Sequence, residues 1–416
     1  MVLAAAIVLT GLVILASWGQ MAWYSLRIAS WYPLREPAQD VSARRWPKAA
    51  VLLPLRGADP QLIECLRGLC RQDYPDFQLR LVLDSADDEA WGAVRQAAAE
   101  FPQVSMHTEV LTERLETCSL KSSALLQAVR GLPPDVQIAA VVDADVIVPV
   151  WWLRELVRPF DDPQVVMSGG LRWFLPERTN CGSVIRRIWG AAASAQMYSL
   201  NIPWGGTLAY RADFVRDPAL QRRWSETFVE DVSVAECCAA RGQKLKLIPR
   251  LSMVNTETIS LGACYRFMRR QIFSVRMYHP AWRRVMLTCL GLVLSCILTG
   301  LVSSFAVQQG AAWAAWMLWG LLLGLMVVTT APLLYLEQCL HAAATKERPI
   351  PGLSVMQLPM IPATIVVYGA ALLGAARMRR IDWRGICYQI GPRGRVRRLN
   401  DGPYRSAPDN GAASLL

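Results

Sequence analysis

The sequence predicts an α/β protein in which a Rossmann-like mixed sheet with crossover helices is combined with transmembrane helices at both ends. Short apolar runs alternate with helical periods between Lys48 and about Leu251, the pattern of strands joined by crossover helices. Uncharged stretches long enough to cross a bilayer lie on both sides of this region. The chain is also 53% hydrophobic and contains 16 tryptophans, which is high for a soluble protein.

The charge balance favours an anionic partner. The 44 Lys and Arg residues exceed the 33 Asp and Glu residues, which gives a net charge of +11. Because the arginine clusters flank apolar stretches and no nucleic-acid-binding motif is recognisable, we expect a membrane partner and no nucleic acid. The 11 cysteines lack the spacing of a metal site, which indicates free thiols facing a reducing cytoplasm.

Residues 1–32 are expected to form an N-terminal transmembrane anchor. No charge occurs before Arg27, and aromatic residues gather near the end of the stretch. A cleaved signal peptide would carry basic residues before its apolar part, and none is present, so we expect a retained anchor. Its amino terminus would lie outside, and its basic flank would lie in the cytoplasm. Residues 33–47 form the expected linker.

Residues 48–255 form the expected α/β domain, in which three predicted strands end in polar residues. The three endings are Pro54-Leu-Arg56-Gly57, Asp84 and Asp143-Ala-Asp145. Because the carboxyl ends of parallel strands meet at one edge of a sheet, we expect these residues to share a crevice. Asp143 and Asp145 could hold a divalent cation there, with substrate phosphates completing its shell. The alternative is that each aspartate only caps the following helix.

Two further motifs follow in the same domain. The double glycine of Trp204-Gly205-Gly206 lets the backbone approach a ligand closely, with Trp204 as an apolar plate, although a simple tight turn is the alternative. Glu230 and Asp231 open a predicted helix that runs to Gly242. Acidic residues suit the first turn of a helix, so structure alone could explain them. Asp231 is nevertheless the third acidic site of the domain.

The stretch that follows the domain predicts membrane contacts. Residues 256–284 mix arginines with aromatic residues, which is typical of amphipathic interfacial helices. Residues 285–336 contain two uncharged stretches joined by a short polar turn, the pattern of two transmembrane helices.

The last part of the chain is less regular. Residues 337–376 are expected to contain a loop and the apolar stretch from Val355 to Ala376, which carries two prolines. We expect an interfacial or re-entrant segment here, with a fourth crossing as the alternative, because a crossing would place the arginines that follow outside. Residues 377–416 form an expected basic cytoplasmic tail, disordered after Asn400.

Taken in order, the motifs resemble those of membrane-bound family 2 glycosyltransferases with the GT-A fold, most closely the ceramide glucosyltransferase-like branch. The resemblance spans most of the chain from Lys48 to Tyr388. The matching motifs are Pro54-Leu-Arg56-Gly57, Gln72-Asp-Tyr74-Pro75, Leu83-Asp84, Cys118-Ser-Leu-Lys121, Asp143-Ala-Asp145, Pro203-Trp204-Gly205-Gly206, Glu230-Asp231, Arg269-Arg270-Gln271 and Asp382-Trp383-Arg384-Gly385. Each motif alone is weak, and their order and spacing make the match strong.

The resemblance implies an inverting transferase that moves one hexose, with glucose expected, from a UDP-linked sugar to a hydroxyl group of a ceramide-like or other membrane lipid. Asp143 and Asp145 would bind Mg²⁺ or Mn²⁺ across the diphosphate. Asp231 would be the general base that removes the proton of the attacking hydroxyl, with Glu230 as its orienting neighbour. The implied enzyme is an integral membrane protein whose catalytic domain, residues 48–255, faces the cytoplasm.

The resemblance also implies donor-binding roles for residues outside the acidic sites. The implied roles are base and ribose contacts from Pro54, Arg56 and Asp84, positive charge near the diphosphate from Lys121, Arg269, Arg270 or Arg276, and pocket walls from Trp204, Gly205 and Gly206. Contact with lipid headgroups is the alternative for the arginines.

The sequence departs from the family in the Q/R-x-x-R-W motif that usually precedes the C-terminal spans. Counting from Gln271 finds Ser274 and Val275 where Arg and Trp belong, and counting from Arg266 leaves Arg270 in place of Trp. This departure argues against a processive polysaccharide synthase, in which the Trp is expected beside the acceptor chain.

Other functions stay open at this stage. A polyprenyl-phosphate or polysaccharide glycosyltransferase is the alternative enzyme. A transporter or a non-catalytic membrane scaffold is the alternative from another class, although no charged residue in the predicted spans marks a substrate path. The sequence does not determine the oligomeric state.

Overall fold

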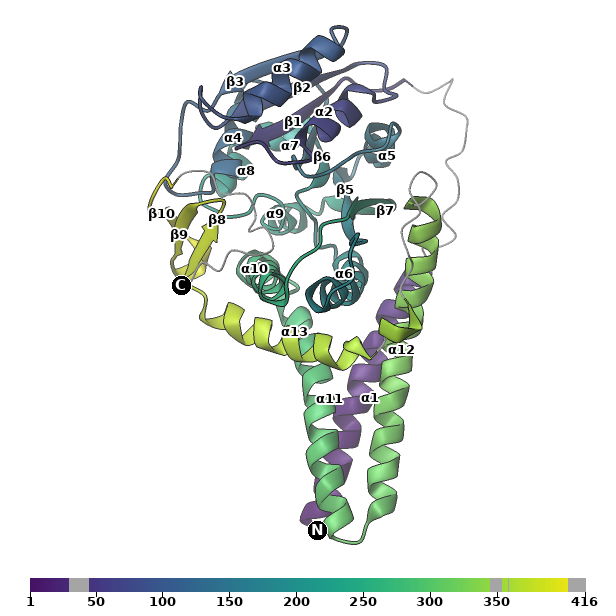
Figure 1. The fold of residues 1–416 in the computed structure, drawn as a ribbon. Helices are drawn as coiled ribbons and strands as arrows, with labels where there is room; N and C mark the ends of the chain where they lie inside the picture. The colour runs from purple at the N-terminus through teal and green to yellow at the C-terminus, as the bar shows by residue number, and fades with distance from the viewer. Residues whose placement is uncertain (30–44, 345–353, 358, 403–416) are drawn as a thin grey trace.

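The computed structural model describes residues 1–29, 45–344, 354–357 and 359–402. An α/β domain lies above a stem of long helices, and the N-terminus lies at the far end of that stem (Figure 1). Most of the predicted linker 33–47 and the end of the predicted tail lie outside the described residues. The α/β fold class predicted from the sequence is confirmed.

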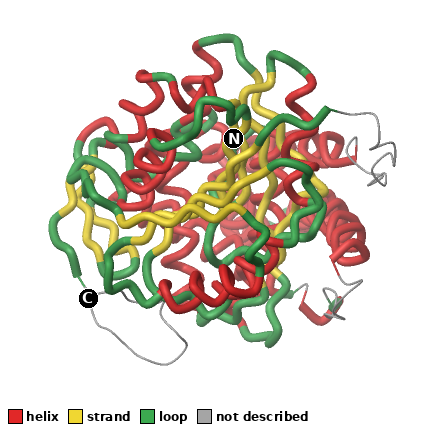
Figure 2. The backbone as a smooth tube through the Cα atoms, turned by 90° about the horizontal axis from the view of Figure 1, so that it is seen from above, coloured by secondary structure: helices red, strands yellow, loops and turns green. Residues whose placement is uncertain are grey.

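The domain is built on a seven-stranded mixed sheet with the order β3-β2-β1-β4-β6-β5-β7. The strands are β1 (Ala49–Leu55), β2 (Phe77–Leu83), β3 (Ser105–Val110), β4 (Ile138–Val142), β5 (Val165–Phe174), β6 (Thr207–Arg211) and β7 (Lys244–Asn255). Strands β3, β2, β1 and β4 are parallel, and β6 enters antiparallel to both β4 and β5. The sheet crosses the middle of the domain with helices on either side (Figure 2).

Alternating side chains of β1 and β4 enter two separate apolar clusters, which explains why these two strands have no polar face. Ala49, Val51 and Leu53 of β1 belong to one cluster, whereas Ala50 and Leu52 belong to the other. The first cluster is closed by helices α2 (Leu62–Cys70), α3 (Ala90–Glu100) and α5 (Trp152–Val157). The second is closed by α4 (Leu120–Arg130), α7 (Ala212–Arg216), α8 (Pro218–Trp224) and α9 (Val234–Ala240).

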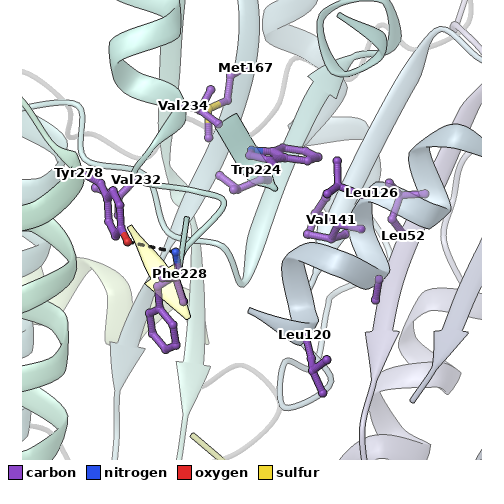
Figure 3. Close-up of a cluster of buried hydrophobic side chains, with 14 of the residues drawn as sticks. Leu52, Leu120, Leu126, Val141, Met167, Trp224, Phe228, Val232, Val234 and Tyr278 are labelled. Carbon is purple, nitrogen blue, oxygen red and sulfur yellow. Dashed lines mark hydrogen bonds between the residues drawn. The ribbon is translucent and has the colours of Figure 1, made fainter. Parts of the chain in front are cut away.

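The second cluster also holds the loop that precedes α9 (Figure 3). The backbone N–H of Phe228 donates to the hydroxyl of Tyr278, with 3.1 Å between the heavy atoms. On its other side, the Phe228 ring meets the ring of Tyr388 edge-on, with 5.2 Å between the centroids. Two aromatic residues from the C-terminal part of the chain therefore position the loop that carries Glu230 and Asp231.

Three helices of the stem pack against one another, namely α1 (Val2–Ala29), α11 (Trp282–Gln308) and α12 (Ala312–Ala344). All three contain a stretch that is long and apolar enough to cross a membrane. Tryptophans occur at both ends of the stem: Trp23 lies near the domain, and the side chain of Trp316 is 79% exposed at the far end. Aromatic residues at both levels and exposed apolar residues between them are the pattern of lipid-facing helices.

Helix α13 (Met360–Arg377) is the fourth helix that could cross a membrane by length and composition. It lies across the stem instead of along it, beneath α6 (Cys181–Ser199) and α10 (Leu261–Tyr278) (Figure 1). This orientation supports the proposal of an interfacial segment, although the stretch begins outside the helix, with a short 3-10 helix, η2 (Val355–Gln357). The other short helices are η1 (Arg158–Asp161) and η3 (Pro392–Gly394).

Most of the stretch 256–284, which was expected to form interfacial helices, lies in helix α10. Helix α10 packs against both α6 and α13, and it buries Met268, Ile272, Phe273 and Tyr278 in the second cluster of the domain. The arginines in this stretch suggested a headgroup contact, but α13 covers the side of α10 that faces the stem. Tertiary packing therefore makes α10 part of the domain.

The structure also corrects the expectation that residues 377–416 form a simple tail. Residues 380–398 make an antiparallel sheet of β8 (Arg380–Trp383), β9 (Ile386–Ile390) and β10 (Val396–Arg398). The physical reason is a period-two pattern, hidden among arginines, that buries Ile381, Ile386, Tyr388, Ile390 and Val396. This small sheet packs on the second cluster of the domain.

Candidate active site

The three predicted strand endings meet at one edge of the sheet, because β1, β2 and β4 are parallel neighbours. Arg56 forms an ion pair with Asp84, which is also paired with Arg114 at 2.9 Å. Asp143 and Asp145 follow β4 in the same row. The expected row of polar residues therefore forms, with ion-paired acidic and basic groups beyond β1 and β2 and a second group beyond β4.

Lys121 is the centre of the second group. Its Nζ lies 2.6 Å from Asp143 Oδ1 and 2.7 Å from Glu230 Oε1, and it donates to the carbonyl oxygen of Gly205 at 3.2 Å. Lys121 lies in the first turn of α4, where the side chain of Ser119 caps the helix by accepting from the N–H of Ser122. The cap and the burial of the first turn place the ammonium between residues that are remote in sequence.

The double glycine is required by this close packing. A Cβ atom on Gly205 would lie 2.5 Å from Glu230 Oε1 and 2.9 Å from Lys121 Nζ, closer than side-chain atoms approach. A Cβ on Gly206 would overlap the ring of Trp204. Gly206 is thus needed by the turn itself, and Gly205 by the close approach of Glu230 and Lys121.

Asp231 is held at the same place by two backbone donors. Its Oδ2 accepts from the N–H of Gly205 and its Oδ1 from the N–H of Val232, both at 2.6 Å. The loop is fixed by Trp224, whose indole N–H donates to the carbonyl oxygen of Glu230. Asp231 precedes α9 and does not lie inside it, so the predicted helix begins later than expected, at Val234.

The electrostatics of the site shift the pKa values of two carboxylates, Asp231 and Asp143, in opposite directions. Burial and the neighbouring Glu230 raise the pKa of Asp231 to about 7, against the opposing effect of Lys121. Burial would also raise the pKa of Asp143, but Lys121 and Arg172 together hold that pKa below its usual value. Asp143 is therefore a permanent anion at neutral pH, whereas Asp231 can exchange a proton.

Arg172 on β5 belongs to the site and was not predicted. Its guanidinium lies 3.6 Å from Asp143 Oδ2, 3.4 Å from Asp145 Oδ2 and 4.5 Å from the ring centre of Trp204. The available signal was a single arginine inside the otherwise uncharged run Val165–Phe174. Asp59 and Arg384 were missed too, although Arg384 belongs to one of the motifs that carried the resemblance.

Four predicted site residues lie on helix α10, namely Arg269, Arg270, Gln271 and Arg276. Of these four, only Arg270 interacts with the acidic group around Asp143 and Asp145. Arg270 is half-buried, and the charges of Asp143 and Asp145 act on it. Arg269 instead packs along Gly374 of α13, and Arg276 donates to the carbonyl oxygens of Ala375 and Ala376. The side chain of Gln271 makes no hydrogen bond to the site among the described residues.

Asp143 and Asp145 have the chemistry of a divalent cation site. Both carboxylates face one guanidinium, that of Arg172, so their oxygens converge on a shared point. In the described part of the chain no cluster of three or more His, Cys, Asp or Glu side chains could hold a metal alone. A cation at this pair would need further oxygen ligands, which the phosphates of a substrate can supply.

Comparison with known proteins agrees with this geometry. The family model described as Glycosyl transferase family 21 matches residues 5–396. A ceramide glucosyltransferase of Gibberella zeae is 27% identical over 70 residues, which cover 16% of this chain and only 13% of that protein. The mannosyltransferase PcManGT from Pyrobaculum calidifontis, solved in complex with GDP-Man and Mn²⁺, is 20% identical, with a TM-score of 0.50. That match covers 90% of this chain and 98% of the other, and it supports the GT-A fold.

Proposed function

Because the chain belongs to glycosyltransferase family 21, we propose that it moves one hexose, with glucose expected, from a nucleotide diphosphate sugar to a hydroxyl group of a membrane lipid. UDP-glucose is the proposed donor, and a ceramide-like lipid is the proposed acceptor. One observation carries the proposal: Asp231, whose pKa is raised to about 7, accepts from the N–H of Gly205, and the carbonyl oxygen of Gly205 accepts from Lys121, the ion-pair partner of Asp143. A proton acceptor and a cation-binding carboxylate are thereby held side by side.

The proposed mechanism assigns each group one task. Asp231 accepts the proton of the lipid hydroxyl as its oxygen attacks the anomeric carbon, and a single displacement inverts that carbon. Lys121 fixes Asp143 and Glu230 in place through its two ion pairs. Asp143 and Asp145 would hold Mg²⁺ or Mn²⁺, which when bound neutralises charge that builds on the diphosphate. Arg56 and Asp84 lie at the end of the edge where base and ribose would bind.

The pH dependence of the rate should report the raised pKa of Asp231. We expect kcat/KM to rise as the pH increases through about 7, because the base acts only after losing its proton. The groups that face Asp231 are Glu230 beside it, Lys121 from α4 and the buried phenol of Tyr210 from β6. The variant Glu230→Gln should move the midpoint to lower pH, since a negative neighbour is removed. The deprotonated fraction of a base with this pKa grows roughly tenfold in total between pH 6 and pH 8, so a rate that is flat over that range would contradict the base assignment.

The acceptor side of the proposal rests on a cavity between the stem and the domain. This cavity of about 90 Å³ is lined by apolar and hydroxyl-bearing residues from α1, α6, α11, α12 and α13. One wall is a polar cluster in which Gln196 donates to the hydroxyls of Tyr24 and Thr288 at 3.3 and 3.0 Å. An apolar space with one polar wall, at the end of membrane-length helices, suits a lipid chain near its headgroup.

Helix α6 connects this cavity to the candidate active site. Ala193 lines the cavity, and the neighbouring Ser194 donates to the carbonyl oxygen of Arg172 on β5. One helix, about 10–12 Å across, therefore separates the cavity from the strand that carries Arg172. A lipid whose chain lies in the cavity could extend its headgroup toward the carboxylates.

Filling the cavity should weaken use of the lipid and not of the donor. We expect Ala193→Phe to raise the KM for the lipid acceptor about tenfold, because losing space for one or two methylene groups costs about that much. The KM for the nucleotide sugar should stay within about twofold in steady-state assays. The control Ser304→Phe places the same ring on the exposed outer face of α11 and should change neither value. An unchanged lipid KM in Ala193→Phe would remove the cavity from acceptor binding.

The proposed function is tested by feeding membranes that contain the full chain with a panel of nucleotide sugars and analysing the lipids by mass spectrometry. A lipid carrying one hexose is the expected product. A polyprenyl-phosphate sugar or a polysaccharide would favour the alternative enzymes. Calorimetric titration with UDP-glucose and Mn²⁺ separates enzyme from scaffold, because a scaffold with a degenerate domain should not bind the donor.

A further inference from the structure

The turn between β8 and β9 contains an arginine in an unfavourable backbone conformation. Trp383 pairs with Ile386, so the turn between them contains only Arg384 and Gly385. Their φ angles are 51° and 87°, both in the left-handed region. Two-residue hairpin turns of this kind favour Asn-Gly or Gly-Gly, because a long side chain in the left-handed region crowds its own backbone. An arginine at this position is strained, which suggests that its side chain has a task.

The tip of this hairpin packs against the loop after β1, at the end of the sheet edge where the base and ribose of the donor are proposed to bind. Arg384 donates to the carbonyl oxygen of Arg56 at 3.3 Å and forms an ion pair with Asp59 at 3.5 Å. On the other side, Gly402 packs so closely on Gly385 that a Cβ atom would lie 2.2 Å from the Gly385 oxygen. Gly402 also accepts a hydrogen bond at 2.7 Å from Arg56. Arg384 is therefore held between the loop after β1 and the segment after β10.

The hairpin is also fixed relative to the candidate catalytic residues. The hydroxyl of Tyr388 on β9 accepts from the backbone N–H of Leu120, which directly precedes Lys121. The ring of Tyr388 packs against Phe228 in the loop that carries Asp231. Tyr388 thus connects the hairpin that carries Arg384 to the segments that carry Lys121 and Asp231.

Three guanidinium groups from distant elements interact electrostatically with Asp143: Arg172 lies 3.6 Å from it, and the charges of Arg384 and Asp143 act on each other, as do those of Arg270 and Asp143. Arg172 comes from β5, Arg270 from α10 and Arg384 from the hairpin. Arg270 has no ion-pair partner among the described residues, and burial together with the charges of Arg172 and Arg384 lowers its pKa to about 10. Positive groups that repel one another at a partly buried site are stabilised by a bound anion. A divalent cation on Asp143 and Asp145 would add further positive charge beside these guanidinium groups.

We propose that Arg384, together with Arg270, binds the diphosphate of the donor nucleotide, so that the hairpin completes the donor site from the C-terminal end of the chain. The planar fork of each guanidinium suits the paired oxygens of a phosphate. This inference rests on the proposed function and adds to it the residues that contact the most strongly charged part of the donor. It also gives the short C-terminal sheet a function besides packing.

The test compares UDP with uridine, which lacks both phosphates. The full-length protein in detergent with Mn²⁺ is titrated with each ligand by calorimetry. The main variant is Arg384→Asn, because Asn is favoured in this turn and should keep the hairpin folded. We expect about a 10–100-fold loss of UDP affinity, as for losing hydrogen bonds to a charged group, and less than about a twofold change for uridine. Thermal stability should stay equal or rise.

Two further variants sharpen the comparison. Arg384→Lys should recover part of the UDP affinity, because an ammonium keeps the charge without the fork. Arg397→Ala removes an exposed arginine from β10 of the same sheet and should bind both ligands normally.

Two results would overturn this inference. Equal losses for UDP and uridine in Arg384→Asn would show that the residue only holds the hairpin, and unchanged UDP binding would show that it does not reach the phosphates. A wild-type chain that binds neither ligand would instead overturn the proposed function itself. The failure of one proposal is therefore distinguishable from the failure of the other.

Discussion

The variant Asp231→Asn is expected to lose nearly all sugar transfer, with a fall in kcat of about 10²–10⁴-fold, because a positioned general base contributes a factor of that size. The amide keeps the shape of the side chain, and its single oxygen can accept one of the two backbone hydrogen bonds, from Gly205 or from Val232, so the loop should stay folded. Donor binding should be close to normal, since the carboxylate is proposed to act on the acceptor. The measurement is single-turnover transfer to lipid, with UDP-glucose binding measured in parallel.

The matched control for this variant is Glu226→Gln, which makes the same chemical change at an exposed position in the same loop. Its transfer rate should equal that of the wild type. If Asp231→Asn binds the donor and transfers sugar at a near-normal rate, Asp231 is not the base. Glu230, which is buried beside it and paired with Lys121, would then be the next candidate.

The variant Asp145→Asn should produce the second-largest loss, a fall in kcat/KM of about 100-fold or more. A bound cation is worth several kcal/mol of charge stabilisation in the transition state, and about 1.4 kcal/mol corresponds to a tenfold change in rate. Asp145 is a cleaner target than Asp143, because Asp143 also pairs with the buried Lys121. The Mn²⁺ concentration needed for half-maximal activity should rise in the variant, and a chelator should abolish wild-type activity.

Asp213→Asn serves as the control for the metal prediction. Its carboxylate lies on the same domain but is 98% exposed and only loosely paired with Arg216, at 3.8 Å. Activity and Mn²⁺ dependence should both be unchanged. Wild-type activity that persists without divalent cations, or an Asp145→Asn variant with an unaltered Mn²⁺ response, would contradict the assignment of a metal to this pair.

The edge of the crevice could be predicted because it follows from local patterns. Apolar runs that end in Arg56, Asp84 and Asp143 identify both the strands and the points where they end. The rule that parallel strands present their carboxyl ends together then brings those residues to one row, and the structure has them there. Each step depends only on a few neighbouring residues and on one general property of parallel sheets.

The arginines of the site could not be assigned in this way. Arg269, Arg270 and Arg276 lie on one helix with similar surroundings in sequence, yet only Arg270 faces the carboxylates. Which face of α10 points to the domain depends on how α6 and α13 pack against it. Arg172 was missed for the same reason, since an arginine within a strand is read as solvent-facing until the opposite wall of the site is known.

The α/β sheet, the membrane-length helices around it and the acidic residues at the strand ends could all be predicted from the sequence, because hydrophobic periodicity and turn-forming residues report burial within short windows. Two features follow from tertiary packing alone: α10 lies inside the domain, and the basic C-terminal segment folds back as a sheet. Tertiary packing also places Arg384 beside Arg56, a residue 328 positions earlier in the chain. Such contacts depend on the packing of whole elements, and no short window of sequence contains the information that sets it.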